Sequence, residues 1–138
     1  MDSINWILPS RGNLNGPLSR SGIRVSIHNN GLSKRSYKNG KQLAITIYSD
    51  AMKRFRLLAG DRVLIGHDEY GIYIKRTSGN GFILSPTGVD KSERHKAVGK
   101  HVTSVIKTKT IDGISPQIFD LESIKETQDG TLFISTIG

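Results

Sequence analysis

The chain has 138 residues, of which 36% are hydrophobic and 23% charged, and this is the size and composition of one folded domain. No stretch reaches the roughly 18 uninterrupted apolar residues of a membrane-spanning helix, and residues 1–9 lack the basic start of a signal peptide. The absence of cysteine excludes disulfides, thiolate catalysis and cysteine-based zinc sites. Together these features predict a cytoplasmic protein that does not bind membranes.

The positive charge is concentrated in one part of the sequence. Lys and Arg number 20 against 12 Asp and Glu, and residues 1–60 contain ten of these basic residues but only two acidic ones. Residues 90–109 form a second basic stretch, whereas 110–138 has five carboxylates against Lys125. A one-sided excess of this kind favours binding to DNA or RNA, because each phosphate that is neutralised releases condensed counterions.

The first part of the chain alternates between irregular and strand-like segments. Residues 1–22 are rich in Gly, Pro and Asn and have no sustained period, which predicts an extended or mobile basic arm. Residues 23–27 and 43–47 alternate between apolar and polar side chains, as strands do. Between them, 28–41 contains two Asn-Gly pairs and four positive charges, which predicts a basic loop.

A short helix is expected after the second strand. Ser49 and Asp50 are typical of a helix start, and Met52, Phe55 and Leu58 give the helix one apolar face before Gly60 ends it. Strands are then predicted over 62–66, 71–76, 82–85, 101–107, 118–124 and 132–137, with an irregular basic link at 86–100. The sequence therefore predicts a mainly β chain with one short helix.

One segment has the order of elements found in a known family. The strand 45–48, the helix 49–55, the Gly-Asp pair at 60–61 with its strand 62–65, and the closing hairpin 68–75 follow one another without a gap. In this, residues 43–76 resemble the swapped-hairpin DNA-binding domain of AbrB/SpoVT and MazE-type regulators. Tyr48 replaces the usual proline, Met52 a helix arginine, and Arg56 the glycine between two leucine-like positions. Arg56 in a left-handed helix end would be strained, so a different helix end is expected here.

The resemblance implies a small swapped-hairpin or cradle-loop-like β-barrel. One hairpin unit forms half of such a barrel, and in the family two chains interleave to close it, so a homodimer is expected. A second route is internal repetition, because a shift of 60 residues places 71–74 on 131–134, and a degenerate second half would then close the barrel within one chain. The predicted organisation is an arm at 1–22, an AbrB-like unit at 23–88, and a linker with a C-terminal β extension at 89–138.

The resemblance and the charge together predict a transcriptional regulator that contacts duplex DNA through the basic loop and helix. Arg35 and Arg54 are the best candidates for base reading, because a planar guanidinium can bond both acceptors of guanine. The alternative is that the basic side chains have no nucleic-acid partner and only keep the protein soluble. The predicted DNA-binding residues are Arg24, Lys34, Arg35, Lys38, Lys41, Lys53, Arg54 and Arg56.

Two other classes of function stay open. An OB-like barrel would bind single-stranded nucleic acid, with outward-facing aromatics of the predicted strands stacking on bases. A protein-binding adaptor or antitoxin would use the acidic segment 110–138. The four histidines share no compact ligand spacing, and no nucleophile or acid–base pair stands out, so no metal, no cofactor and no enzymatic activity are predicted.

Overall fold

The computed structural model of the chain describes residues 20–29, 41–111 and 113–136. Its strands form two five-stranded sheets, A and B, in which every paired strand runs antiparallel to its neighbour. The prediction of a mainly β chain is confirmed. Among the residues described, no helix is long and apolar enough to cross a membrane.

Sheet A joins strands from both ends of the sequence. Its spatial order is β6 (Ser85–Pro86), β7 (Ser104–Lys109), β2 (Lys41–Ile47), β1 (Ile23–Asn29) and β8 (Gln117–Phe119). β1 pairs with β2 along its whole length, and β2 pairs on its other side with β7. The alternation predicted for 23–27 and 43–47 is confirmed, because every second residue of these strands is buried.

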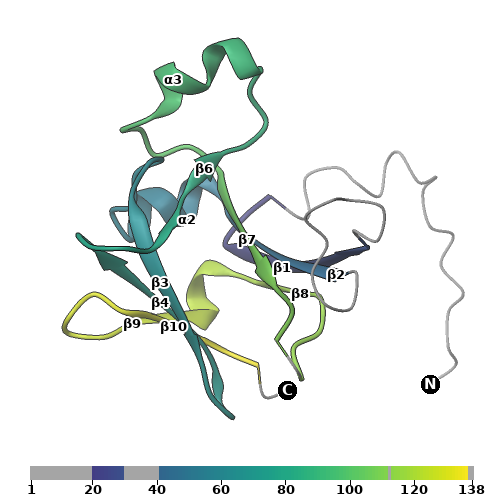
Figure 1. Cartoon of the computed structure of the whole chain (residues 1–138). Helices are drawn as coiled ribbons and strands as arrows, with labels where there is room; N and C mark the ends of the chain where they lie inside the picture. The colour runs from purple at the N-terminus through teal and green to yellow at the C-terminus, as the bar shows by residue number, and fades with distance from the viewer. Residues whose placement is uncertain (1–19, 30–40, 112, 137–138) are drawn as a thin grey trace, which may run out of the picture.

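Sheet B consists of two hairpins and one short strand. Its spatial order is β5 (Phe82–Ile83), β3 (Arg62–His67), β4 (Gly71–Thr77), β10 (Leu132–Ser135) and β9 (Ile124–Glu126). The Asp68 carboxylate accepts hydrogen bonds from the backbone N–H groups of Tyr70 and Gly71, at 2.8 and 3.1 Å, and so shapes the predicted turn between β3 and β4. In Figure 1, β1, β2 and β8 lie on one side of the molecule, and β3, β4, β9 and β10 on the other.

The core lies between the inner faces of the two sheets. Aliphatic side chains from both sheets form a single buried cluster, and they include Ile23, Leu43, Ile45, Ile47, Ile72, Ile74, Ile106, Leu132 and Ile134. The helix α2 (Ser49–Arg54) adds Ala51 and Met52, which are fully buried. Burial of these side chains is the main force that holds the sheets together.

The helix α2 ends at a left-handed residue that is not a glycine. Arg56 has a φ of 59°, in the left-handed region. The Leu57 N–H donates to the Met52 carbonyl at 2.8 Å, and the Arg56 N–H to the Lys53 carbonyl at 3.3 Å, which is the bond pattern of a Schellman helix end. The expectation of a different helix end at this position is therefore wrong, and a non-glycine residue occupies the strained position.

Three predicted segments differ from the structure: 82–85 divides into β5 of sheet B and β6 of sheet A, and two others contain short helical turns. The expected link at 86–100 contains the 3-10 helix η2 (Lys91–Glu93) and the helix α3 (Arg94–Ala97), of which only Ala97 is buried, so no apolar period reveals them. The expected strand 118–124 is divided by η3 (Leu121–Ser123), where the Asp120 side chain accepts from the Ser123 N–H at 2.9 Å. Its two parts are β8 in sheet A and β9 in sheet B.

The second half of the chain covers the edge of the first hairpin. The resemblance predicts a second chain at this edge, but β10 of the same chain pairs with β4 there. The β4 edge is therefore not open to a second chain. The homodimer stays a prediction that this edge does not support.

The two sheets do not close into a barrel within the described residues. Both sheets combine strands of the predicted segments 23–88 and 89–138, and the arm lies outside the described residues except for 20–22.

Candidate nucleic-acid interface

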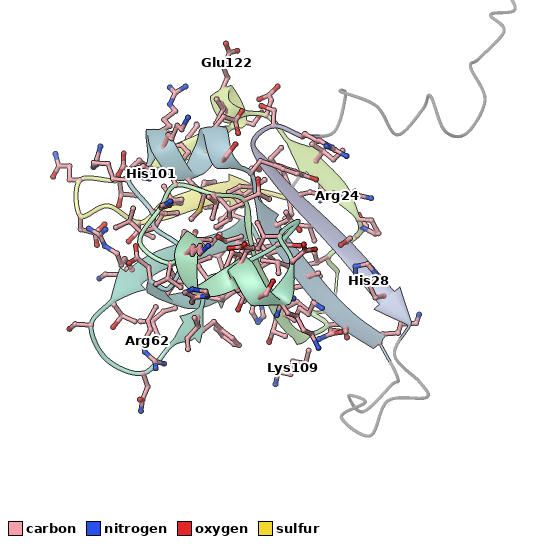
Figure 2. The ribbon with its side chains drawn as sticks, turned by 90° about the horizontal axis from the view of Figure 1, so that it is seen from above. Arg24, His28, Arg62, His101, Lys109 and Glu122 are labelled. Atoms are coloured by element: carbon pink, nitrogen blue, oxygen red, sulfur yellow. The ribbon has the colours of Figure 1, made fainter. Side chains whose placement is uncertain are left out.

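The face of sheet A that points away from the core gathers positive charge. Cross-strand partners share a face, so the strand registers define which side chains lie together. We call this surface the basic face, and its members are Arg24, Ser26 and His28 of β1, Gln42, Ala44 and Thr46 of β2, and Val105, Lys107 and Lys109 of β7. Figure 2 shows Arg24 and His28 along β1, with Lys109 toward the end of the sheet where His28 lies.

The cations of the basic face have no carboxylate partner in the described part of the chain. No Asp or Glu occupies a position on this face, and no ion pair of the described residues involves Arg24, Lys107 or Lys109. The ion pairs among the described residues are Arg56–Glu126, Lys75–Asp129, Arg76–Asp61 and Lys96–Glu93. Two of these pairs use carboxylates of the acidic tail, so the tail neutralises cations elsewhere and the basic face keeps its positive potential.

The outward face of sheet B has a different character. Tyr73 and Phe133 lie on it side by side, with ring centroids 4.9 Å apart. The Tyr73 hydroxyl donates to the Asp68 carboxylate at 2.7 Å, which lowers the pKa of Asp68 and raises the pKa of Tyr73. Lys75 on the same strand pairs with Asp129 at 3.5 Å. This face therefore has an aromatic pair and places carboxylates beside its cations, whereas the face of sheet A has cations and no carboxylate among its described members.

A hollow of about 570 Å³ opens over part of the basic face. Its floor includes Ala44 and Thr46, and its walls come from β5, β6 and α3. The cations that line it are Arg94 and Lys107, His28 also lines it, and no carboxylate is present among its described lining residues. Phe82 and Ile83 of β5 also line it, with 37% and 48% of their surfaces exposed. The hollow thus combines positive charge with exposed apolar surface.

A second hollow, of about 640 Å³, continues from the first toward α2. The two share Thr46 and Thr87, and the second also has Arg20 and Ser49 in its lining. Lys53 is exposed one helical turn after Ser49, on the same side of the helix. The basic face, the two hollows and the start of α2 therefore form a continuous surface.

Asp50 fixes the start of β1 against α2 at the end of this surface. Its carboxylate accepts hydrogen bonds from the Ser21 hydroxyl, from the Gly22 N–H at 3.0 Å, and from the Ala51 N–H at 2.7 Å. Burial alone raises the pKa of Asp50, but these hydrogen bonds outweigh it and hold the pKa below its ordinary value. The ionised carboxylate therefore stabilises the junction that positions Arg24.

The two predicted DNA-binding residues that lie on strands, Arg24 and Lys41, are far apart in the structure. Arg24 lies on the basic face and is exposed. Lys41 begins β2 opposite Asn29, five residues from Thr46, which places it about 17 Å along the strand from the row of Arg24. The other predicted cations of the loop, Lys34, Arg35 and Lys38, lie outside the described residues.

The predicted cations of the helix have different surroundings. Lys53 and Arg54 are exposed on α2, and the Arg54 guanidinium lies 5.9 Å from the centre of the Phe55 ring. Arg56 pairs with Glu126 of the acidic tail at 3.1 Å. The described members of the predicted set therefore do not form one patch, although Arg24 and Lys53 lie along the same continuous surface.

Sequence reasoning missed several residues of the basic face and of the hollow beside it. His28, Arg94, Lys107 and Lys109 were outside the predicted set, and all but His28 come from the basic stretch 90–109. The alternation of Lys107 and Lys109 on the β7 strand was a usable signal that both point to one face. The pairing of β7 with β2, which joins residues about 60 positions apart, carries no local signal.

Comparison with protein-family models, with curated proteins and with solved structures finds no match to this chain. Within the described residues, no three His, Asp or Glu side chains come together in a way that could hold a metal ion.

Proposed function

We propose that this chain is a nucleic-acid-binding protein that contacts the phosphate backbone of duplex DNA across the basic face. The observation that carries the proposal is that Arg24, Lys107 and Lys109 on this face have no carboxylate partner among the described residues. Cations that are already paired would have to lose a partner before binding a phosphate, whereas these do not.

A role in transcription regulation follows from the resemblance to AbrB-like proteins. The order strand, short helix, Gly-Asp turn and hairpin is present as β2, α2, β3 and β4, and this order supports the proposal. The internal second hairpin offers a local two-fold arrangement within one chain, which suits an operator with two similar halves. The predicted loop cations Lys34, Arg35 and Lys38 extend the same proposal to the β1–β2 connection.

The acidic tail supports the protein-binding alternative less well. Asp129 accepts hydrogen bonds from Thr127 and Thr131, which hold its pKa well below the ordinary value, and it also pairs with Lys75. Glu126 pairs with Arg56. Part of the negative charge of this segment is thus used within the chain.

The proposal is tested by fluorescence anisotropy with a labelled blunt duplex over a series of salt concentrations. The wild-type chain is expected to bind, with affinity that falls steeply as salt rises. The double variant Arg24→Glu, Lys107→Glu should weaken binding at least tenfold and reduce the slope of log affinity against log salt by about two. Circular dichroism should show an unchanged thermal midpoint, because both side chains are exposed.

A matched control is Lys125→Glu, which makes the same charge change on β9 of sheet B. Lys125 is exposed and lies level with Phe133, away from the basic face. Its reversal should change duplex affinity no more than about twofold at moderate salt, because Lys125 lies on the outward face of the other sheet and salt screens its charge. The proposal fails if the wild-type chain binds no nucleic acid at low salt, or if the control variant loses as much affinity as the double variant.

A further inference from the structure

The hollow between β5, β6, α3 and the basic face has features that phosphate contact alone does not explain. Phe82 is an exposed aromatic residue on a two-residue strand, and it lines the same hollow as Arg94 and Lys107. Exposed aromatic surface beside unpaired cations is the combination that proteins use for unstacked bases, since every base has a face that can stack and a phosphate attached to it.

The volume of the hollow limits what can enter. About 570 Å³ lies within the range of clefts that hold one small ligand. A base that is paired and stacked within a duplex cannot reach into such a hollow, and it must first leave the stack. The chemistry of the lining is also specific, because the described lining residues include two cations and no carboxylate. Charge complementarity therefore favours a nucleotide, which carries a negative phosphate, over an uncharged apolar ligand.

We propose that this hollow takes an unpaired nucleotide, with its base against Phe82 and its phosphate toward Arg94 and Lys107. The inference rests on the proposed nucleic-acid binding and deepens it, because it names the structural class of nucleic acid that binds best. A duplex whose single-stranded overhang reaches the hollow uses both the basic face and Phe82. A blunt duplex uses the basic face alone.

The experiment compares three labelled ligands of related sequence: a blunt duplex, the same duplex with a single-stranded overhang, and the single strand. The full chain and its Phe82→Ala variant are titrated with each. The wild-type chain should bind the overhang duplex more tightly than the blunt duplex. The variant should lose five- to a hundredfold in affinity for the overhang duplex and the single strand, which is the range for loss of one stacked base. Its affinity for the blunt duplex should change less than twofold.

Two further variants separate stacking from structural damage. Phe82→Tyr keeps the ring and should keep the preference for the overhang. Leu64→Ala truncates an exposed apolar side chain on the outward face of sheet B, outside the hollow, and should leave the preference nearly unchanged. If Phe82→Ala lowers affinity for all three ligands equally, or for none of them, the unpaired-nucleotide site is wrong.

The outcome also distinguishes this inference from the broader proposal. If the blunt duplex binds and responds to Arg24→Glu with Lys107→Glu, but the overhang adds no affinity, only the site at Phe82 is wrong. If no ligand binds the wild-type chain at low salt, both proposals fail. If the single strand displaces the blunt duplex and Phe82→Ala abolishes that advantage, the hollow is a single-strand site.

Discussion

Tyr73 of β4 and Phe133 of β10 are cross-strand partners, and a shift of 60 residues along the sequence also places one on the other. The same shift places Ile72 on Leu132, whereas in the sheet Ile72 aligns with Ile134. The antiparallel pairing is thus centred on Tyr73 and Phe133, and a local two-fold axis between these two residues relates the two strands. The hairpins β3–β4 and β9–β10 therefore meet as two similar halves within one chain.

The halves share more than their hairpins. In the first half, β2 leads through α2 into β3 and β4, and in the second half β8 leads through η3 into β9 and β10. Both β2 and β8 pair with β1 in sheet A. Each element of the second half is shorter than its counterpart in the first.

The junction of the two hairpins depends on Gly71. A Cβ added at this residue would lie 2.0 Å from the Ile134 carbonyl oxygen, so the strands β4 and β10 would have to move apart. We expect Gly71→Ala to destabilise the chain by more than about 2 kcal/mol. Chemical denaturation followed by circular dichroism measures this change.

Gly66 on β3 provides the control for that substitution. The nearest atom to an added Cβ there is the Cβ of Tyr73, at an ordinary contact distance of 3.9 Å. Gly66→Ala should change stability by less than about 1 kcal/mol. Equal losses in the two variants would show that close approach of β10 is not the reason for Gly71.

Arg56 is a position where the natural residue is not the most stable one. A left-handed conformation costs a non-glycine residue about 1–2 kcal/mol, and the exposed pair with Glu126 returns less than about 1 kcal/mol. Arg56→Gly should therefore stabilise the chain by about 0.5–1 kcal/mol, as the midpoint of urea unfolding would report. Arg56→Ala keeps the strain and removes the ion pair, so it should be less stable than Arg56→Gly; the reverse order would contradict the helix-end geometry.

The Asp50 carboxylate should make stability depend on pH in the acid range. Its pKa is lower in the folded chain than in the unfolded chain, so it stabilises the fold above the unfolded value of about 4 and loses this effect as pH falls further. Asp50→Asn should destabilise the chain near neutral pH, and the difference from wild type should shrink as pH falls below about 4. Thermal unfolding over a pH series measures this, with Asp90→Asn, at an exposed position without a side-chain cap bond, as the control. A difference that stays constant with pH would contradict the role given to the ionised carboxylate.

The cations of α2 should add to DNA binding at low salt. Lys53 lies one helical turn from Ser49, at the end of the second hollow, so Lys53→Glu should weaken duplex binding a few-fold in a salt-dependent way. Arg56→Ala, which removes a cation already paired with Glu126, should have a smaller effect. Equal binding by wild type and Lys53→Glu at the lowest salt would limit the interface to sheet A.

Local patterns predicted the elements well where one face of a strand is buried. The alternation at 23–27 and 43–47 identified β1 and β2, and the apolar spacing at Met52 and Phe55 identified α2. The helical turns at 91–97 and 121–123 were missed because they bury almost no apolar side chain, so their residues have no period.

The interface was harder to predict than the elements, because it depends on which strands become neighbours. Arg24 was identified from its charge, but its grouping with Lys107 and Lys109 follows from β2 pairing with both β1 and β7. The excess of charge in residues 1–60 suggested a patch built from that segment alone. In the structure, Arg56 instead pairs with Glu126 of the acidic segment 110–138, and Lys107 and Lys109 of the second basic stretch lie on the basic face.

Amide chemical shifts of the isotope-labelled chain, recorded while a blunt duplex is added at low salt, would locate the bound DNA. We predict that the shifted resonances belong to β1, β2 and β7, including Arg24, Thr46 and Lys107, and that those of β4, β9 and β10 stay in place. Shifts concentrated on the Tyr73–Phe133 face of sheet B, or no shifts at any DNA concentration, would contradict the assignment of the basic face as the nucleic-acid interface.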